Sequence, residues 1–166
     1  MFTLKPISRD SVGSALAKAE RYRLLNEPHE AESICRDILE VDPANRQARI
    51  SLILALTDEI PQDPGAFARA IGAMPGLESA YDRTYYSGIA WERRAKASRD
   101  AGAVGSGSYI YDWIVRALRL FEEAERLRPA GNDDAILRWN ACVRFLEQHK
   151  DLGPKTEEIP DPILSE

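Results

Sequence analysis

The chain has 166 residues, of which 44% are hydrophobic and 30% charged, a composition that suits one globular domain with a sizeable core. Its formal net charge of −5 argues against a nucleic-acid surface, because such surfaces are usually basic. No segment approaches the run of about 18 apolar residues that indicates a transmembrane helix, so we expect no membrane association.

The N-terminal residues MFTLKPISRD lack the apolar run of a secretory signal peptide, and we expect a cytoplasmic protein. Cys35 and Cys142 are too far apart in sequence for a metal-ligand motif, and a disulfide is not expected in this compartment. We expect no cofactor. The basic residues are 17 Arg and 5 Lys, a bias typical of bacterial genomes rich in G and C.

Helical periodicity begins near Ser11, and strand patterns are nearly absent. The first predicted helix ends before Pro28, because proline suits the first turn of a new helix better than the interior of an old one. The second ends at Asp42, since a residue that precedes proline avoids α geometry. Its apolar positions have offsets of 0, 3, 4, 7 and 10 and define one face: Ala31, Ile34, Cys35, Ile38 and Val41.

A second helical pair is expected from Arg46, and Pro61 and Pro64 restrict its second helix to a short segment. A third pair is expected from near Tyr81. Its second helix repeats the earlier spacing, with Ala117, Leu120, Phe121, Ala124 and Leu127. Pro129 follows this helix as Pro43 follows the earlier one. Two helices with the same spacing and the same terminator, 86 residues apart, indicate an internal repeat.

Residues 12–45 resemble the tetratricopeptide repeat, a helix–turn–helix unit of about 34 residues. Tyr22, Ala31 and Pro43 fall on the family's aromatic, small and terminating positions, whereas Ala15 and Ala19 replace its usual Trp and Gly. The resemblance implies an all-α, right-handed α-α superhelix over residues 1–150. Its three repeats are expected at about 12–45, 46–77 and 78–131, with a capping helix at 132–149 and an acidic, proline-containing tail at 151–166.

The repeat register predicts an insert of about 17 residues in the third repeat, around 98–112, that lengthens both helices about the glycine-rich tip AGAVGSGS (101–108). The tip lacks the spacing and the Lys-Ser/Thr of a P-loop, so we interpret it as a hairpin tip. Seven of the thirteen aromatic residues lie in 81–113. Internal packing of a long hairpin explains them most simply, and a partner or dimer surface is the alternative.

The stretch HEAESICRDILEVDPAN (29–45) contains His29, Cys35 and Asp37, the residue types of a thiol enzyme. Six residues of helix turn the chain by about 600°, which leaves His29 and Cys35 about 120° apart. Cys35 also stands where Phe121 stands in the second copy, as expected of a packing position. We therefore expect no catalytic residues, no metal site and no enzymatic activity.

In the tetratricopeptide family, the first helix of each repeat lines a concave groove that holds peptides. The resemblance therefore implies a non-enzymatic scaffold that binds a peptide or helical segment of another protein. Carried across one repeat at a time, the groove positions are Leu16, Glu20, Arg23, Ile50, Leu54, Asp58, Asp82, Tyr85, Tyr86, Ile89, Arg93 and Arg138. The family's chaperone-binding branch clamps a C-terminal carboxylate with Lys, Asn and Arg. Leu16 and Glu20 occupy such first-repeat positions here, so that ligand is not expected.

Two other functions remain open: a bacterial secretion-type chaperone that holds an apolar client, and a homo-oligomerisation module that uses the 81–113 hairpin. An enzyme is a further rival, and a deep pocket that contains titratable groups with perturbed pKa values would reopen it. The run WERRAKASRD (91–100) places Arg93, Lys96 and Arg99 near one helix face, which is either solvated or available to an anionic partner group. In the tail, apolar residues are expected to dock on a groove of the same molecule or a neighbouring copy. These are Ile159, Pro162, Ile163 and Leu164.

Overall fold

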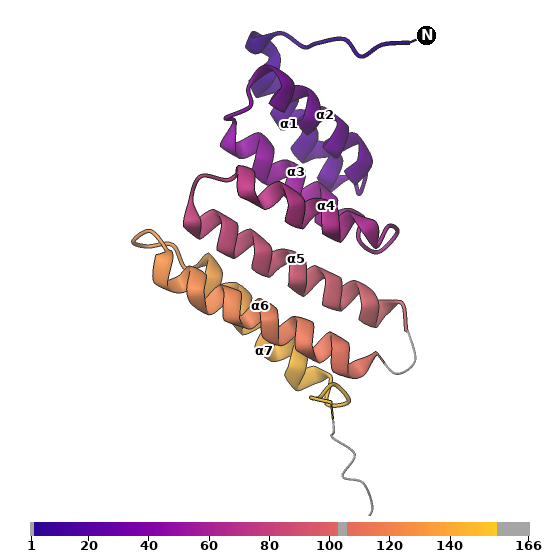
Figure 1. Ribbon diagram of the computed structural model, residues 1–166, viewed down its shortest axis with the longest axis vertical. Helices are drawn as coiled ribbons and strands as arrows, with labels where there is room; N and C mark the ends of the chain where they lie inside the picture. Colours follow the sequence, from indigo (N-terminus) through magenta and orange to yellow (C-terminus); the bar gives the residue numbers. More distant parts are fainter. Residues whose placement is uncertain (1, 103–105, 156–166) are drawn as a thin grey trace, which may run out of the picture.

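The computed structural model describes residues 2–102 and 106–155, and these form seven α-helices and two short 3-10 helices without a strand (Figure 1). The all-α prediction is confirmed for these residues. No helix within the described ranges is both long and apolar enough to cross a bilayer. The helices are α1 (Val12–Leu24), α2 (Pro28–Val41), α3 (Arg46–Glu59), α4 (Gly65–Ala73), α5 (Ala80–Asp100), α6 (Gly107–Leu127) and α7 (Asp134–Gln148).

The helices follow one another along an elongated stack, with the N-terminal helices at one end and α7 at the other (Figure 1). Each helix packs against the next in the chain. The odd-numbered helices α1, α3, α5 and α7 also contact one another in order, so they form a continuous row. Side chains of α1, α3 and α5 can therefore meet although they are far apart in sequence.

The predicted helix ends are confirmed for the first helices, and local chemistry explains them. Pro28 occupies the first turn of α2, and α2 ends one residue before Asp42. At the start of α3, Asn45 Oδ1 accepts a hydrogen bond of 2.9 Å from the backbone N–H of Ala48. The last helix begins slightly later than predicted, at Asp134, whose N–H donates to Asn132 Oδ1 at 2.9 Å.

The two copies of the helical spacing bury the same positions. Ala31, Cys35 and Ile38 of α2 are 0% exposed, as are the corresponding residues of α6, which are Ala117, Phe121 and Ala124. The other two positions of each copy are partly or largely exposed. The second helices of the first and third pairs therefore use one packing solution, in which small residues allow close approach and one larger side chain fills the space between helices.

The third pair is the longest: α5 and α6 have 21 residues each, whereas α2 and α3 have 14 each. Most aromatic side chains of 81–113 pack within this part of the structure. Trp91 and Trp113 are partly buried, and the guanidinium of Arg94 lies 4.2 Å from the centre of the Trp113 ring. Tyr109 is an exception, since it is 60% exposed. Internal packing thus accounts for most of the aromatic cluster.

The described part of the C-terminal tail folds back on the third pair. Leu152 is 8% exposed and packs in the core formed by α5, α6 and α7. Asp151 forms an ion pair with Arg99 of α5. The apolar tail residues expected to dock on a groove, Ile159, Pro162, Ile163 and Leu164, lie outside the described residues, as does part of the glycine-rich tip (103–105).

Two glycines in different surroundings, one in the contact between α5 and α6 and one in α4, are predicted to respond in opposite ways to substitution by alanine. A Cβ on Gly88 would lie 2.6 Å from Phe121 Cε1, whereas a Cβ on Gly72 of α4 would meet nothing within 4 Å. We expect Gly88→Ala to lower the free energy of unfolding by about 1–3 kcal/mol through overpacking. Gly72→Ala should raise it by about 0.5–1 kcal/mol, because alanine favours the helix.

Denaturant unfolding of the two variants and the wild type measures both values. Equal effects of the two substitutions would show that the α5–α6 contact does not require glycine.

Candidate functional site

Asp58, near the C-terminal end of α3, joins three helices of the odd-numbered row. Its Oδ2 lies 2.8 Å from Arg23 Nε of α1, and its Oδ1 accepts a hydrogen bond from Arg93 of α5. Arg93 also donates to Thr57 Oγ1 at 2.5 Å and to the carbonyl oxygen of Leu54 at 3.2 Å. These bonds hold the Arg93 guanidinium in one orientation before any ligand arrives.

A pocket of about 380 Å³ opens over this ion-pair network. Basic, acidic and apolar residues of α1, α3 and α5 and their ends line it: Arg23, Leu24, Asn26, Thr57, Asp58, Pro61, Arg93, Lys96, Ala97 and Asp100. Three of these carry a positive charge and two a negative charge, so the lining has a net charge of +1, although the whole chain has −5. The pocket therefore favours an anionic group over a cationic one.

The three positive charges of the pocket are partly buried, and each has an acidic partner, Asp58 for Arg23 and Arg93 and Glu92 for Lys96. Desolvation lowers the pKa of Arg93, but arginine keeps its proton throughout the physiological range. Lys96 Nζ lies 2.5 Å from Oε1 of Glu92, a side chain that is only 1% exposed. Arg138 of α7 lies 3.6 Å from the other oxygen of Glu92. A second set of ion pairs, made by Glu92 with Lys96 and Arg138, thus links α5 to α7.

Two leucines at the end of α1 are exposed to solvent. Leu24 is 89% exposed and lines the pocket, whereas Leu25 is 60% exposed and does not line it. Water-exposed leucine at a pocket rim is available to an incoming apolar side chain, since its burial by a ligand removes apolar surface from water. The pocket thus combines an exposed leucine at its rim with a network of ion pairs beneath it.

The twelve residues predicted for the groove lie at different depths. Buried ones are Ile50, Asp82, Tyr85 and Ile89; half-buried ones are Leu16, Arg23, Leu54, Asp58, Tyr86, Arg93 and Arg138; Glu20 is exposed. Asp82 accepts two hydrogen bonds from Arg46, at 2.6 and 2.8 Å, and so has a partner already. Of the twelve, Arg23, Asp58 and Arg93 line the pocket. The groove as a peptide site stays a prediction.

The sequence reasoning placed Arg93, Lys96 and Arg99 near one face, and the structure divides them. Arg93 and Lys96 line the pocket, while Arg99 pairs with Asp151 of the tail. Leu24, which also lines the pocket, was not among the residues predicted for the groove, although the sequence contains an indication of its exposure. It lies off the apolar stripe of its helix, so its side chain had no predicted packing partner.

The thiol and histidine of the 29–45 stretch lie in different environments, as the helical angle predicts. Cys35 is fully buried, and burial raises the pKa of its thiol to about 11, so it stays neutral near pH 7. His29 is exposed and lies beside Glu32 and Glu59. Burial, and after it the neighbouring Glu32, raises the pKa of Glu59. Sequence reasoning did not foresee this cluster, because Glu59 belongs to another helix.

The comparisons give no relative from which a role for these residues could be transferred. No family model matches the chain, no curated protein matches it, and no solved structure matches it. The function must therefore be inferred from the geometry and the chemistry of the residues themselves.

Proposed function

We propose that this protein is a tetratricopeptide-type scaffold that binds a segment of another protein in the pocket between α1, α3 and α5. The observation that carries the proposal is the ion-pair network of Arg23, Asp58 and Arg93, which lies under a pocket with a net positive lining. The segment it suits carries a carboxylate next to an apolar side chain. The proposal needs no bond-making step, and its specificity comes from shape and placed charge.

Several features support a repeat array of this family. Three helix pairs and a final helix follow one another in the order that three repeats and a capping helix require. The copied spacing in α2 and α6 buries the same positions. Gly88 approaches Phe121 closely, at a position where the family has a small residue. Under the proposal, the odd-numbered row lines the concave side of a right-handed superhelix.

The chemistry of the pocket indicates the ligand class. An arginine guanidinium offers donors in a planar fork that matches a carboxylate, and Arg93 has only one of its terminal nitrogens engaged in the bonds described above. Its orientation is fixed by Thr57 and Leu54, so a ligand loses little entropy in ordering it. Leu24 at the rim supplies apolar contact. An acidic residue flanked by a leucine or phenylalanine satisfies both parts.

The two alternative functions have less support from the side-chain arrangement. A chaperone that holds an apolar client would be expected to have an apolar groove, whereas half of the residues that line this pocket are charged. Self-association through the 81–113 hairpin would be expected to use exposed aromatic side chains. Most of those side chains pack internally, and Tyr109 is the one exposed to 60%.

The exposed leucines provide a matched pair of variants. Peptides selected from a random displayed library against the wild-type protein should be enriched in Asp or Glu next to an apolar residue. Leu24→Glu places a negative charge at the pocket rim and should weaken binding of these peptides about tenfold. Leu25→Glu makes the same chemical change at the next position and should alter the affinity less than about twofold. Fluorescence anisotropy with labelled peptides measures both.

Salt dependence gives an independent check, since an ionic contact weakens as the salt concentration rises from about 0.05 to about 0.5 M. A library without acidic enrichment, or equal losses in the Leu24→Glu and Leu25→Glu variants, would contradict the proposed pocket.

A further inference from the structure

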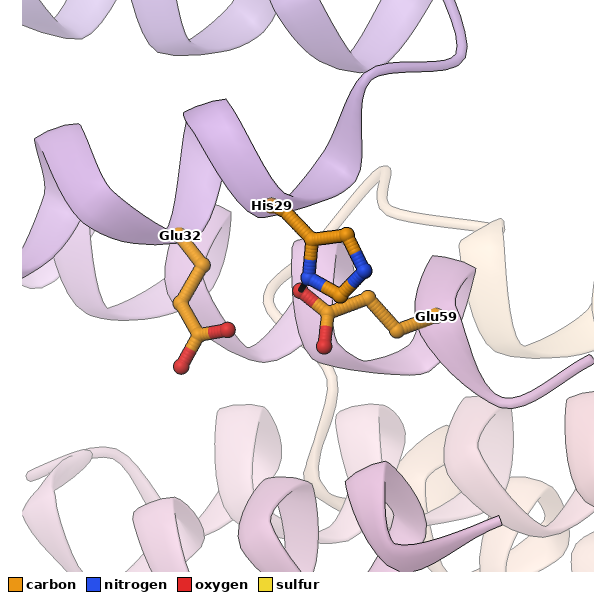
Figure 2. A group of neighbouring side chains, drawn as sticks. All are labelled: His29, Glu32 and Glu59. Atoms are coloured by element: carbon orange, nitrogen blue, oxygen red, sulfur yellow. Dashed lines mark ion pairs between the residues drawn. The ribbon is translucent and has the colours of Figure 1, made fainter. Parts of the chain in front are cut away.

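Three side chains from two helices meet at the junction of α2 and α3. His29 and Glu32 lie in the first turns of α2, and Glu59 is the last residue of α3. One ligand atom from each lies within 4.8 Å of the others. Figure 2 shows the imidazole of His29 directly above the carboxylate of Glu59, with the carboxylate of Glu32 at the side. An i, i+3 pair from one helix and a carboxylate from its neighbour thus converge.

Glu59 is the unusual member of this cluster, because its side chain is 0% exposed. Its Oε2 lies 2.7 Å from Arg69 Nη2 of α4. Its Oε1 is buried and receives no hydrogen bond from any described residue, although His29 Nδ1 lies 3.2 Å away. A buried carboxylate oxygen without a hydrogen bond is costly in an interior of low dielectric constant, and among the described residues the ion-pair contact with exposed His29 is what compensates this one.

The surrounding charges leave room for a cation. Arg36 donates through Nε and Nη2, at 2.9 and 2.5 Å, to the same oxygen of Glu32, and Arg69 bonds one oxygen of Glu59. Arg69 also pairs with Asp63 at 2.7 Å. Three carboxyl groups therefore face two guanidiniums, which gives a net charge of −1 when all three are ionised and His29 is neutral. Each glutamate keeps one oxygen that no arginine holds.

We propose that the imidazole of His29 and one carboxylate oxygen each of Glu32 and Glu59 bind a divalent transition-metal ion such as Zn²⁺, which joins α2 to α3. An imidazole nitrogen with carboxylate oxygens suits Zn²⁺, whereas Mg²⁺ and Ca²⁺ prefer sites made only of oxygen. Water completes the coordination. The site requires no peptide in the pocket and therefore does not depend on the proposed function.

The cluster must contract slightly to hold the ion. Ligand atoms around a tetrahedral Zn²⁺ lie about 3.3 Å apart, so separations of up to 4.8 Å have to shorten by about 1.5 Å. His29 Nδ1 already lies 3.2 Å from Glu59 Oε1, so the separations that have to shorten are those between Glu32 and the other two residues. Buried Glu59 is the fixed point of the site, held from behind by Arg69, in the manner of a ligand oriented by an outer hydrogen bond.

Titration of the metal-free protein with zinc chloride tests the site directly. Isothermal calorimetry at pH 7.5 should show one saturable ion per chain, and the ion should raise the melting temperature. His29→Ala should weaken binding at least about tenfold, because it removes the only nitrogen ligand. The chain has two histidines, so His149→Ala is the matched control and should bind like the wild type. His149 lies outside the cluster, with its Nδ1 2.7 Å from the carbonyl oxygen of Phe145.

A third variant should change the affinity in the opposite direction. Arg36→Ala frees Oε1 of Glu32 and removes a positive charge near the ion, so Zn²⁺ affinity should rise about threefold or more. Arg36 side-chain atoms are 56% exposed, and the substitution should leave the fold intact. An increase in this variant is not expected of a merely structural cluster, and its loss in the double variant His29→Ala/Arg36→Ala separates the site from non-specific binding to carboxylates.

Glu59→Gln keeps the shape of the buried side chain and should abolish binding, but His29→Ala tests the site even if that buried variant does not fold. Absence of saturable Zn²⁺ binding to the wild type would overturn the proposal. So would wild-type affinity in His29→Ala, or an equal loss in His29→Ala and His149→Ala.

Discussion

Close packing between neighbouring helix faces is the constraint on which the rest of the structure depends. Helices of this length are marginal in isolation, so each is stabilised chiefly by the apolar face that it buries. Small residues at the contacts, such as Ala31 and Ala117, are fully buried and let the helices approach closely. Where no side chain fits, as at Gly88 against Phe121, the sequence has glycine. This packing aligns α1, α3 and α5 in one row.

The C-terminal end of α3 places two acidic side chains at the packed helix contacts. Asp58 and Glu59 are consecutive, and consecutive helix residues point about 100° apart. Asp58 therefore bonds Arg23 and Arg93 on the row of odd-numbered helices, whereas Glu59 is buried beside His29 of α2 and Arg69 of α4. One helix end thus contributes to the peptide pocket and to the metal cluster that we propose. An ion that fixes this end would also restrain the position of Asp58.

The groove prediction shows what a repeat register can predict about a side chain and what it cannot. A register gives the direction in which a side chain points from its helix, and it led to Arg23 and Arg93, which do share one pocket. It does not give depth. Tyr85 and Ile89 were assigned to the same lining, but the long α5–α6 pair covers both. Depth depends on how neighbouring helices of unequal length cover a face, and no local spacing contains that information.

The sequence by itself determined the helices, the ends of the first ones and the copied packing face, because periodicity, proline and side-chain caps act over a few residues. It also separated His29 from Cys35, since one helical angle decides that. Only the tertiary structure decided which charges meet. Arg23 and Arg93 each reach Asp58 from 35 residues away, and His29 meets Glu59 across a helix boundary. Such contacts depend on distances of a few ångströms between packed helices, which the sequence specifies only through the whole fold.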